Sequence, residues 1–128
     1  ANPAFVADDD TTSPTTGGLS KWSLISGVWT RLWSVNPTGA TGLRSLTGVV
    51  NTDGSIQLYG IDSNTSTRLV GLLDTGAIPT SANFAVLATS PANQVFRGVD
   101  FVPTAIPSPA AAALLGLGGL AAARRRRA

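Results

Sequence analysis

Short apolar runs separated by turn-forming residues make up the first hundred or so residues of the chain. Within the runs, apolar and polar side chains alternate, as in Leu19–Ile25, where Trp22 and Leu24 fall on one face. Alternation with a period of two is typical of strands, and no stretch before Ala110 keeps the 3.6-residue period of a helix over a useful length. The pattern predicts strands at Ala4–Asp8, Leu19–Ile25, Val28–Val35, Leu43–Val50, Ile56–Ile61, Arg68–Leu73, Asn83–Thr89 and Gln94–Val102. We therefore expect an all-β body over residues 1–102.

The breaks between the runs carry the residues that tight turns need. Ser26-Gly27 predicts a two-residue hairpin turn between the second and third strands. Asn51-Thr52-Asp53-Gly54 predicts a turn between the fourth and fifth strands, because Asn, Asp and Gly tolerate turn conformations. Strands that follow one another through such short turns are expected to pair antiparallel.

Segments of the body recur at an interval of about 50 residues. Phe5–Asp9 aligns with Leu58–Asp62, and Arg44–Val49 aligns with Arg97–Val102. Four strands at this interval are typical of a β-propeller blade. The body resembles the C-terminal blades of an exported bacterial β-propeller, which implies about two four-stranded antiparallel blades and a closing first strand at Gln94–Val102. Two blades cannot close a ring, so this reading implies part of a longer ring; a β-sandwich is the alternative.

The composition changes after residue 102. Ile106-Pro107-Ser108-Pro109 comes first, an uncharged run from Ala110 to Ala123 follows, and a cluster of four arginines comes next: Arg124, Arg125, Arg126 and Arg127. A helix over the run would be about 21 Å long, shorter than the roughly 30 Å hydrocarbon core of a bilayer. Its strongly apolar residues, worth about −2 kcal/mol together on insertion scales, are Leu114, Leu115, Leu117 and Leu120. We expect a short transmembrane helix within residues 110–128 that inserts marginally, with the four arginines as a basic stop on the cytoplasmic side.

This order of features resembles the PEP-CTERM sorting signal of Gram-negative bacteria. Pro107 and Pro109 match the prolines of its motif, and Arg124–Arg127 match its basic stop, whereas Ser108 stands where the family usually has Glu. The resemblance implies an exosortase, a membrane-bound cysteine transpeptidase, that cuts near the motif. It also implies a body that faces outward from the inner membrane and then moves to the outer envelope or the extracellular matrix.

Two other interpretations of the tail can be compared with this one. An Ala/Leu-rich helix packed on the body, with a frayed basic end, would also show an apolar run of this kind. Gly116–Ala121 matches a dinucleotide-binding fingerprint, but that fingerprint needs a strand before it and an acidic residue about 20 positions on.

We expect a β-rich body at 1–102, a proline-rich linker with the sorting motif at 103–109 and the membrane span with its stop at 110–128.

The net charge of +2 does not describe the body, because four of the nine basic residues lie in the tail. The chain carries 9 basic and 7 acidic residues, so without Arg124–Arg127 the remainder has 9 − 4 = 5 basic residues and a charge of −2. The basic character belongs to the tail, and no nucleic-acid partner is predicted. No cysteine is present, so disulfides and thiol chemistry are excluded. A start at Ala1 without a leader suggests a mature form or a C-terminal piece of a longer protein.

Candidate chemistry in the body is sparse. The sequence contains no His, Cys, Met or Glu, which excludes a Ser-His-Asp triad and a His or Cys metal site, so we predict no catalytic residue, metal or cofactor. Asp8-Asp9-Asp10 could offer oxygen ligands to Ca²⁺, but their spacing fits a solvated turn better. Arg44 and Arg97, at matching repeat positions, suit an ion pair within each blade or an anionic ligand.

The tryptophans are the remaining candidates for binding. Alternation in the third strand places Trp29, Arg31, Trp33 and Val35 on one face. Together with Trp22, the two tryptophans of that strand are expected to pack in a core between sheets, and an aromatic platform for sugars is the alternative.

These observations predict an exported cell-envelope or exopolysaccharide-associated protein with a structural or binding body, and not an enzyme. The expected partners are an exosortase-type transpeptidase and the membrane, with exopolysaccharide as a further candidate. One alternative is a propeller hydrolase or lyase whose active site lies on blades outside this sequence. Another is a permanently tethered envelope protein whose tail is never cut.

Overall fold

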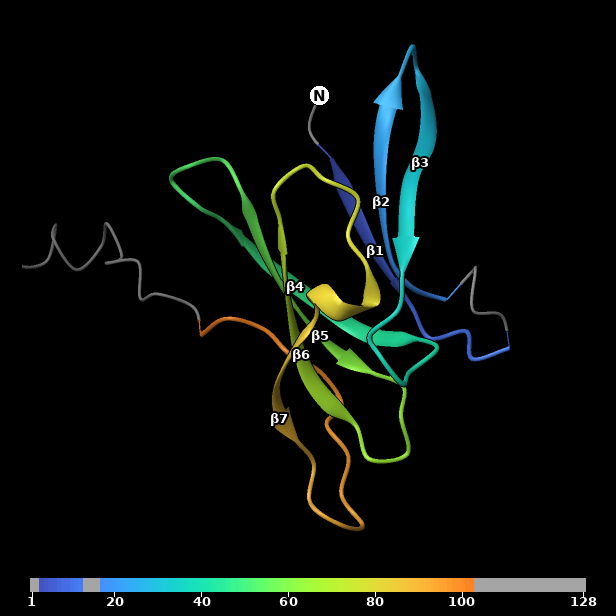
Figure 1. The fold of residues 1–128 in the computed structure, drawn as a ribbon, viewed down its shortest axis with the longest axis vertical. Coiled ribbons are helices and arrows are strands. Elements are labelled where there is room, and N and C mark those ends of the chain that lie inside the picture. Colours follow the sequence, from blue (N-terminus) through green and yellow to red (C-terminus); the bar gives the residue numbers. More distant parts are fainter. Residues whose placement is uncertain (1–2, 13–16, 103–128) are drawn as a thin grey trace, which may run out of the picture.

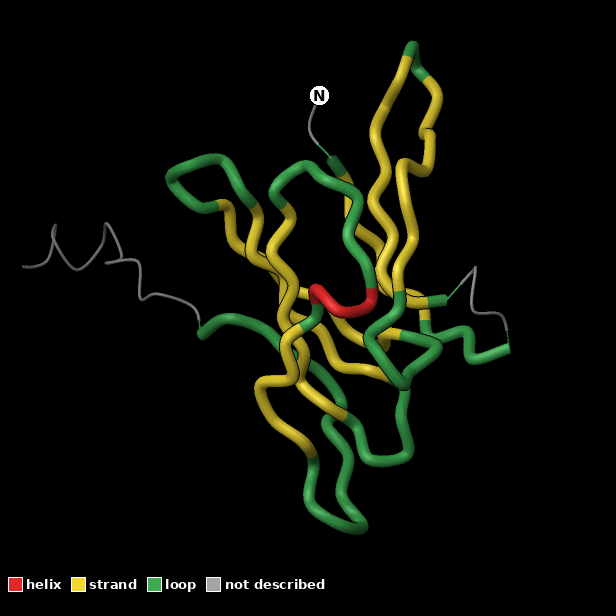
Figure 2. The backbone as a smooth tube through the Cα atoms, in the orientation of Figure 1, coloured by secondary structure: helices red, strands yellow, loops and turns green. Residues whose placement is uncertain are grey.

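The computed structural model describes residues 3–12 and 17–102, which form strands joined by tight turns (Figures 1 and 2). The elements are β1 (Ala4–Asp8), β2 (Gly18–Ile25), β3 (Val28–Val35), β4 (Leu43–Val50), β5 (Ile56–Asp62), β6 (Arg68–Asp74), the 3₁₀ turn η1 (Ser81–Asn83) and β7 (Ala85–Thr89). Strands dominate this part of the chain, so the prediction of an all-β body is confirmed.

The strands form two antiparallel sheets of consecutive strands. The first sheet has the order β1-β2-β3 and the second has the order β4-β5-β6-β7. The predicted bounds of β1, β3 and β4 are confirmed, and β2, β5 and β6 differ from prediction by one residue. β7 begins at Ala85 rather than at Asn83, because η1 occupies Ser81–Asn83 and the Asn83 side chain accepts a hydrogen bond from the Thr80 backbone N–H.

The two sheets pack against each other through one hydrophobic core. The first sheet contributes Leu19, Trp33 and Val35, and the second contributes Leu43, Leu58, Val70 and Leu72. Phe5, Ala7, Leu46, Ile56 and Phe84 are partly buried around this cluster. Burial of a Leu or Val side chain contributes about 1.5–3 kcal/mol, so this shared core is the main source of cohesion between the sheets.

The β2–β3 hairpin extends beyond the rest of the body as a two-stranded arm (Figure 1). Its turn is the predicted Ser26-Gly27 pair, and both residues have positive φ, 51° and 82°, as the favoured two-residue hairpin turn requires. Ile25 pairs directly with Val28 across the turn.

A bulge in this hairpin changes which residues share a face. Lys21 pairs with Trp33 and Trp22 pairs with Arg31, so Leu32 is an extra residue in β3. Such an insertion shifts the alternation by one position. Trp33 is buried in the core, whereas Trp29 is 53% exposed. The prediction that Trp29, Arg31, Trp33 and Val35 share one face is therefore wrong.

The predicted strand Gln94–Val102 is also wrong. Residues 94–102, which we call the strap, form no strand in the described part of the chain. Side-chain hydroxyls bind its backbone instead. The Phe96 N–H donates to Thr67 Oγ1 at 2.7 Å, and the Val99 N–H donates to Ser45 Oγ at 3.0 Å.

The strap crosses the face of the second sheet that points away from the core. The Phe101 ring makes an edge-to-face contact with Tyr59 at 5.8 Å, and Thr47 donates a hydrogen bond to Asp100. Tyr59 follows the core residue Leu58 in β5, so its side chain points to the opposite face. The second sheet thus lies between the strap and β1, so the strap does not pair with β1.

The predicted tail lies outside the described residues. This holds for the linker 103–109 with its sorting motif, which consists of Pro107, Ser108 and Pro109. It holds equally for the positions named for the membrane span, which are Ala110, Leu114, Leu115, Leu117, Leu120 and Ala123. The basic stop falls there too, with its members Arg124, Arg125, Arg126 and Arg127. Among residues 3–12 and 17–102, no helix is long and apolar enough to span a bilayer.

Two neighbouring leucines of β6 provide a test of the core. Leu72 is 1% exposed and Leu73 is 46% exposed. We expect Leu72→Ala to lower the free energy of unfolding by about 2–4 kcal/mol, because it removes buried methyl groups and leaves a cavity. Leu73→Ala, the matched control, should cost less than about 1 kcal/mol. Urea unfolding followed by tryptophan fluorescence measures both, and equal losses would contradict the packing described.

Candidate functional site

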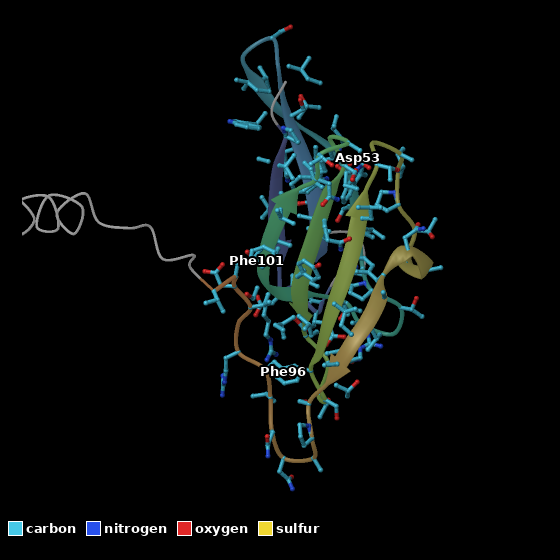
Figure 3. All side chains as sticks on the ribbon, turned by 90° about the vertical axis from the view of Figure 1, so that its left-hand side faces the viewer. Asp53, Phe96 and Phe101 are labelled. Atoms are coloured by element: carbon cyan, nitrogen blue, oxygen red, sulfur yellow. The ribbon has the colours of Figure 1, made fainter. Side chains whose placement is uncertain are left out.

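A pocket of about 400 Å³ opens between the first sheet and one end of the second. Lys21 of β2 and Pro3, just before β1, line it on one side, and the rest of the lining comes from two turns of the second sheet and the strand ends beside them. Those residues are Asp53, Gly54, Ser55, Ile56, Asp74, Thr75 and Gly76. In Figure 3, Asp53 lies near one end of the body and Phe96 of the strap lies toward the other. Among the hollows of the described residues, this one combines three charged side chains from both sheets, and we call it the end pocket.

A buried ion pair forms the floor of the end pocket. Lys21 Nζ lies 2.5 Å from Asp74 Oδ2, and the side chains are only 12% and 3% exposed. The ammonium also lies 5.6 Å from the centre of the Phe5 ring, a favourable position for a cation over an aromatic face. Asp74 additionally accepts a hydrogen bond from the Gly76 N–H at 3.2 Å. The pair joins β2 to β6 and so ties the two sheets together.

Asp53 forms the exposed rim of the pocket. The turn predicted at Asn51–Gly54 is confirmed: the Gly54 N–H donates to Asn51 O at 3.0 Å, and Gly54 has a φ of 84°. The Ser55 hydroxyl and the Ser55 N–H both donate to Asp53 Oδ1, at 2.6 and 2.9 Å. The hydroxyl bond, followed by the backbone bond, lowers the pKa of Asp53 below its ordinary value. Asp53 is therefore a fully ionised acceptor at neutral pH.

This arrangement suits hydrogen bonding better than bond-breaking chemistry. Lys21 and Asp74 neutralise each other, and Asp53 is the carboxylate that faces solvent. Across the described residues, no group of three or more His, Cys, Asp or Glu side chains is placed to hold a metal ion. A ligand of this pocket would be a small polar molecule that donates hydrogen bonds to Asp53.

A second buried ion pair fixes the opposite end of β6. Asp62 is fully buried and accepts hydrogen bonds from both the backbone N–H and the Nε of Arg68. The Arg68 Nη2 group donates to the carbonyl of Thr38 at 2.8 Å. Residues 36–42 connect the first sheet to the second, so Arg68 holds that connection to the second sheet.

Close backbone contact reinforces the same connection. The Ser63 N–H donates to Gly42 O at 3.0 Å. A Cβ on Gly42 would lie 2.9 Å from the backbone of Asp9 and 2.8 Å from Ser63 Oγ, so no larger residue fits without a shift. Gly42 is required here for close approach and not for its conformation.

The sequence-predicted candidates are separated in the fold. In the acidic turn, Asp8 caps the Asp10 N–H and Asp10 accepts two bonds from Thr12, as expected for a solvated turn. Asp9 Oδ2 lies 4.0 Å from Arg44 Nε in an exposed pair.

The repeat arginines and the tryptophans do not come together either. Arg97 is exposed on the strap, and Arg44 lies at the start of β4. Trp33 packs in the core against Phe5, with ring centres 6.1 Å apart, whereas Trp29 is exposed on the arm. Trp22 donates from Nε1 to Ser20 Oγ at 2.9 Å. The tryptophans form no shared platform.

Sequence reasoning missed the Lys21–Asp74 pair of the end pocket and the Arg68–Asp62 pair at the other end of β6. Lys21 offered a signal: it follows the apolar Leu19 by two positions and precedes Trp22, so alternation places the only lysine of the chain on the same face as Leu19. A charge on a core-facing position needs a buried partner. No local pattern identifies Asp74 as that partner. The site residues predicted in the tail, from the sorting motif to the basic stop, lie outside the described part.

Arg68 allows a direct test of the buried pair. Arg68→Met leaves Asp62 buried without its cation and removes the bond to Thr38, so we expect a loss of about 3–5 kcal/mol in the free energy of unfolding. Arg44→Met, which breaks the exposed pair with Asp9, is the control and should cost less than about 1 kcal/mol. Chemical denaturation measures the free energy of unfolding of both variants. Comparable losses would contradict the assignment of one pair as buried and the other as exposed.

The rim carboxylate can be tested by titration. Ser55→Ala removes the hydroxyl bond but keeps the backbone bond, so the pKa of Asp53 should rise part of the way toward its ordinary value. Because the folded pKa is lowered, the stabilisation by Asp53 is present above the unfolded pKa and is lost as the pH falls through the folded pKa. Carboxyl-carbon NMR measures the shift, with Thr52→Ala as control; an unchanged pKa in Ser55→Ala would rule out the hydroxyl as its main cause.

Comparisons with known proteins add no relative. No family model matches the chain, and neither a curated protein nor a solved structure matches it. The resemblance of the tail to the PEP-CTERM signal, and that of the body to propeller blades, therefore rest on the residues alone.

Proposed function

We propose that this chain is an exported cell-envelope protein whose C-terminal tail is a PEP-CTERM-like sorting signal for an exosortase. The observation that carries the proposal is the order of features in residues 105–128: Pro-x-Pro, an uncharged small-residue run and a basic cluster. The body is a structural or binding module, with extracellular polysaccharide as a candidate ligand. The finer architecture proposed for it is a pair of propeller-like blades, and the two antiparallel sheets of consecutive strands support this proposal.

The energetics of the tail fit a temporary membrane element. Ala110–Ala123 is shorter than a full span and gains little from its four leucines, so insertion is marginal. Each arginine costs about 2.5–3.5 kcal/mol at the bilayer centre, so the basic stop, Arg124 to Arg127, holds the C-terminal end on the cytoplasmic side. A marginal span with a strong stop suits a signal that is recognised and then removed.

The end of the body also supports the proposal. The strap makes its last described contact through Phe101, whose ring packs on Tyr59 and whose N–H donates to Asp100 at 2.8 Å. Pro107 follows Phe101 by 107 − 101 = 6 residues. Cleavage near Pro107–Pro109 would leave every described strand and every described strap contact on the released body.

The test compares processing in two strains. The chain is expressed in a Gram-negative host that carries an exosortase gene and in the same host without it. We expect intact mass spectrometry to show loss of the residues after about Pro109 in the first strain only. Pro107→Ala together with Pro109→Ala should abolish cleavage, and Ser108→Glu should increase the cleaved fraction, because Glu is the residue usual at that position.

Controls separate cleavage from folding and topology. Pro103→Ala lies in the same linker but outside the motif and should be processed normally. Replacement of all four arginines of the basic stop by Gln should let the tail lose its orientation and reduce processing while the motif stays intact. A protein that keeps its full mass in both strains but stays in the membrane would show a permanent anchor, and a soluble full-length protein would reject the sorting function.

A further inference from the structure

The arm carries large apolar side chains that no described residue covers. At its tip Ile25 is 50%, Val28 is 64%, Leu24 is 47% and Trp29 is 53% exposed. Figure 3 shows the arm projecting past the end of the body where Asp53 lies. An isolated two-stranded ribbon is only marginally stable in water. Four large exposed apolar side chains gathered at its end form the kind of patch that marks an interaction site.

The apolar tip is two-sided. Ile25 pairs with Val28, and Leu24 pairs with Trp29 in the next position along the ribbon. Paired residues share a face and successive pairs alternate, so one apolar pair lies on each side. A protein surface packed on one side would leave the other side exposed to water. A fluid apolar medium covers both.

The charged residues of the arm indicate which kind of apolar medium would bind it. Residues 11–52 contain Lys21, Arg31 and Arg44 and no acidic residue. Lys21 is paired with Asp74, which leaves Arg31, exposed and opposite Trp22, as the charge nearest the tip. A cation above an apolar tip complements the phosphates of an anionic lipid surface.

The depth of the tip also fits a lipid interface. Two residue pairs at about 3.4 Å each make the apolar part about 7 Å deep, and interfacial segments bury their apolar face by about 5–10 Å. Ser23 pairs with Thr30 above it, and Arg31 follows at headgroup level. Trp29 sits where tryptophans concentrate in membrane proteins, at the boundary between headgroups and acyl chains.

We propose that the β2–β3 arm is a membrane-contact element whose tip enters the surface of an anionic lipid bilayer. The proposal rests on the arm alone and does not depend on the sorting role of the tail. It gives the body a surface that binds lipid at the end opposite the loop between β5 and β6 (Figure 1).

A single-cysteine label tests the arm, because the chain has no cysteine of its own. Val28→Cys carries a polarity-sensitive fluorophore, and Thr65→Cys in the loop between β5 and β6 is the control. Both are made in the full chain with Leu114→Arg and Leu117→Arg, so that the tail cannot insert. We expect a blue shift, and quenching by nitroxide-labelled lipid, for the Val28 label on vesicles containing phosphatidylglycerol, and no response from the Thr65 label.

A charge reversal tests the headgroup contact. Arg31→Glu should weaken partition into the anionic vesicles about tenfold or more, whereas Arg44→Glu, away from the tip, should change it little. Equal responses of the two labels would overturn the proposal. A Val28 response that rises with protein concentration in the absence of lipid would also overturn it, because the partner would then be a second copy of the chain. A response seen only when the tail is intact would overturn it as well.

Discussion

Strand β6 carries an ion pair at each end, and the arrangement of both sheets depends on these two contacts. Asp74 at its C-terminal end binds Lys21 of the first sheet, and Arg68 at its N-terminal end binds Asp62 and the Thr38 carbonyl. Hydrophobic burial between the sheets is large but non-directional. The charged pairs add direction, because each is satisfied only when the sheets and their connection lie in one relative position.

The two sheets differ in what the described residues place beside them. The strap crosses the second sheet, and the hydroxyls of Thr67 and Ser45 accept hydrogen bonds from two of its backbone N–H groups in place of a strand partner. The first sheet instead extends into an arm with apolar side chains on both sides. The body thus has one sheet whose outer face is crossed by the strap and another sheet that extends into an exposed arm.

Local sequence rules were enough for the strands and turns. Ser26-Gly27 and Asn51–Gly54 form the predicted turns, because the conformations they need are set by two to four residues. The same rules failed for Gln94–Val102, whose alternation resembles that of a strand. A strand also needs a free edge to pair with, and the second sheet separates this segment from β1. For the site, composition excluded catalytic classes but could not bring Lys21 together with Asp74.

The sequence by itself determined the all-β class, most strand bounds and the distinct character of the tail, since periodicity, turn chemistry and composition act over a few residues. Tertiary structure alone decided the bulge at Leu32, the strap and the partners of Lys21 and Arg68. Apart from the bulge and the Arg68–Asp62 pair, these features depend on contacts between residues 29 to 54 positions apart. A local pattern carries no information on which distant group fills a buried position. Packing and charge neutralisation in the folded chain make that choice.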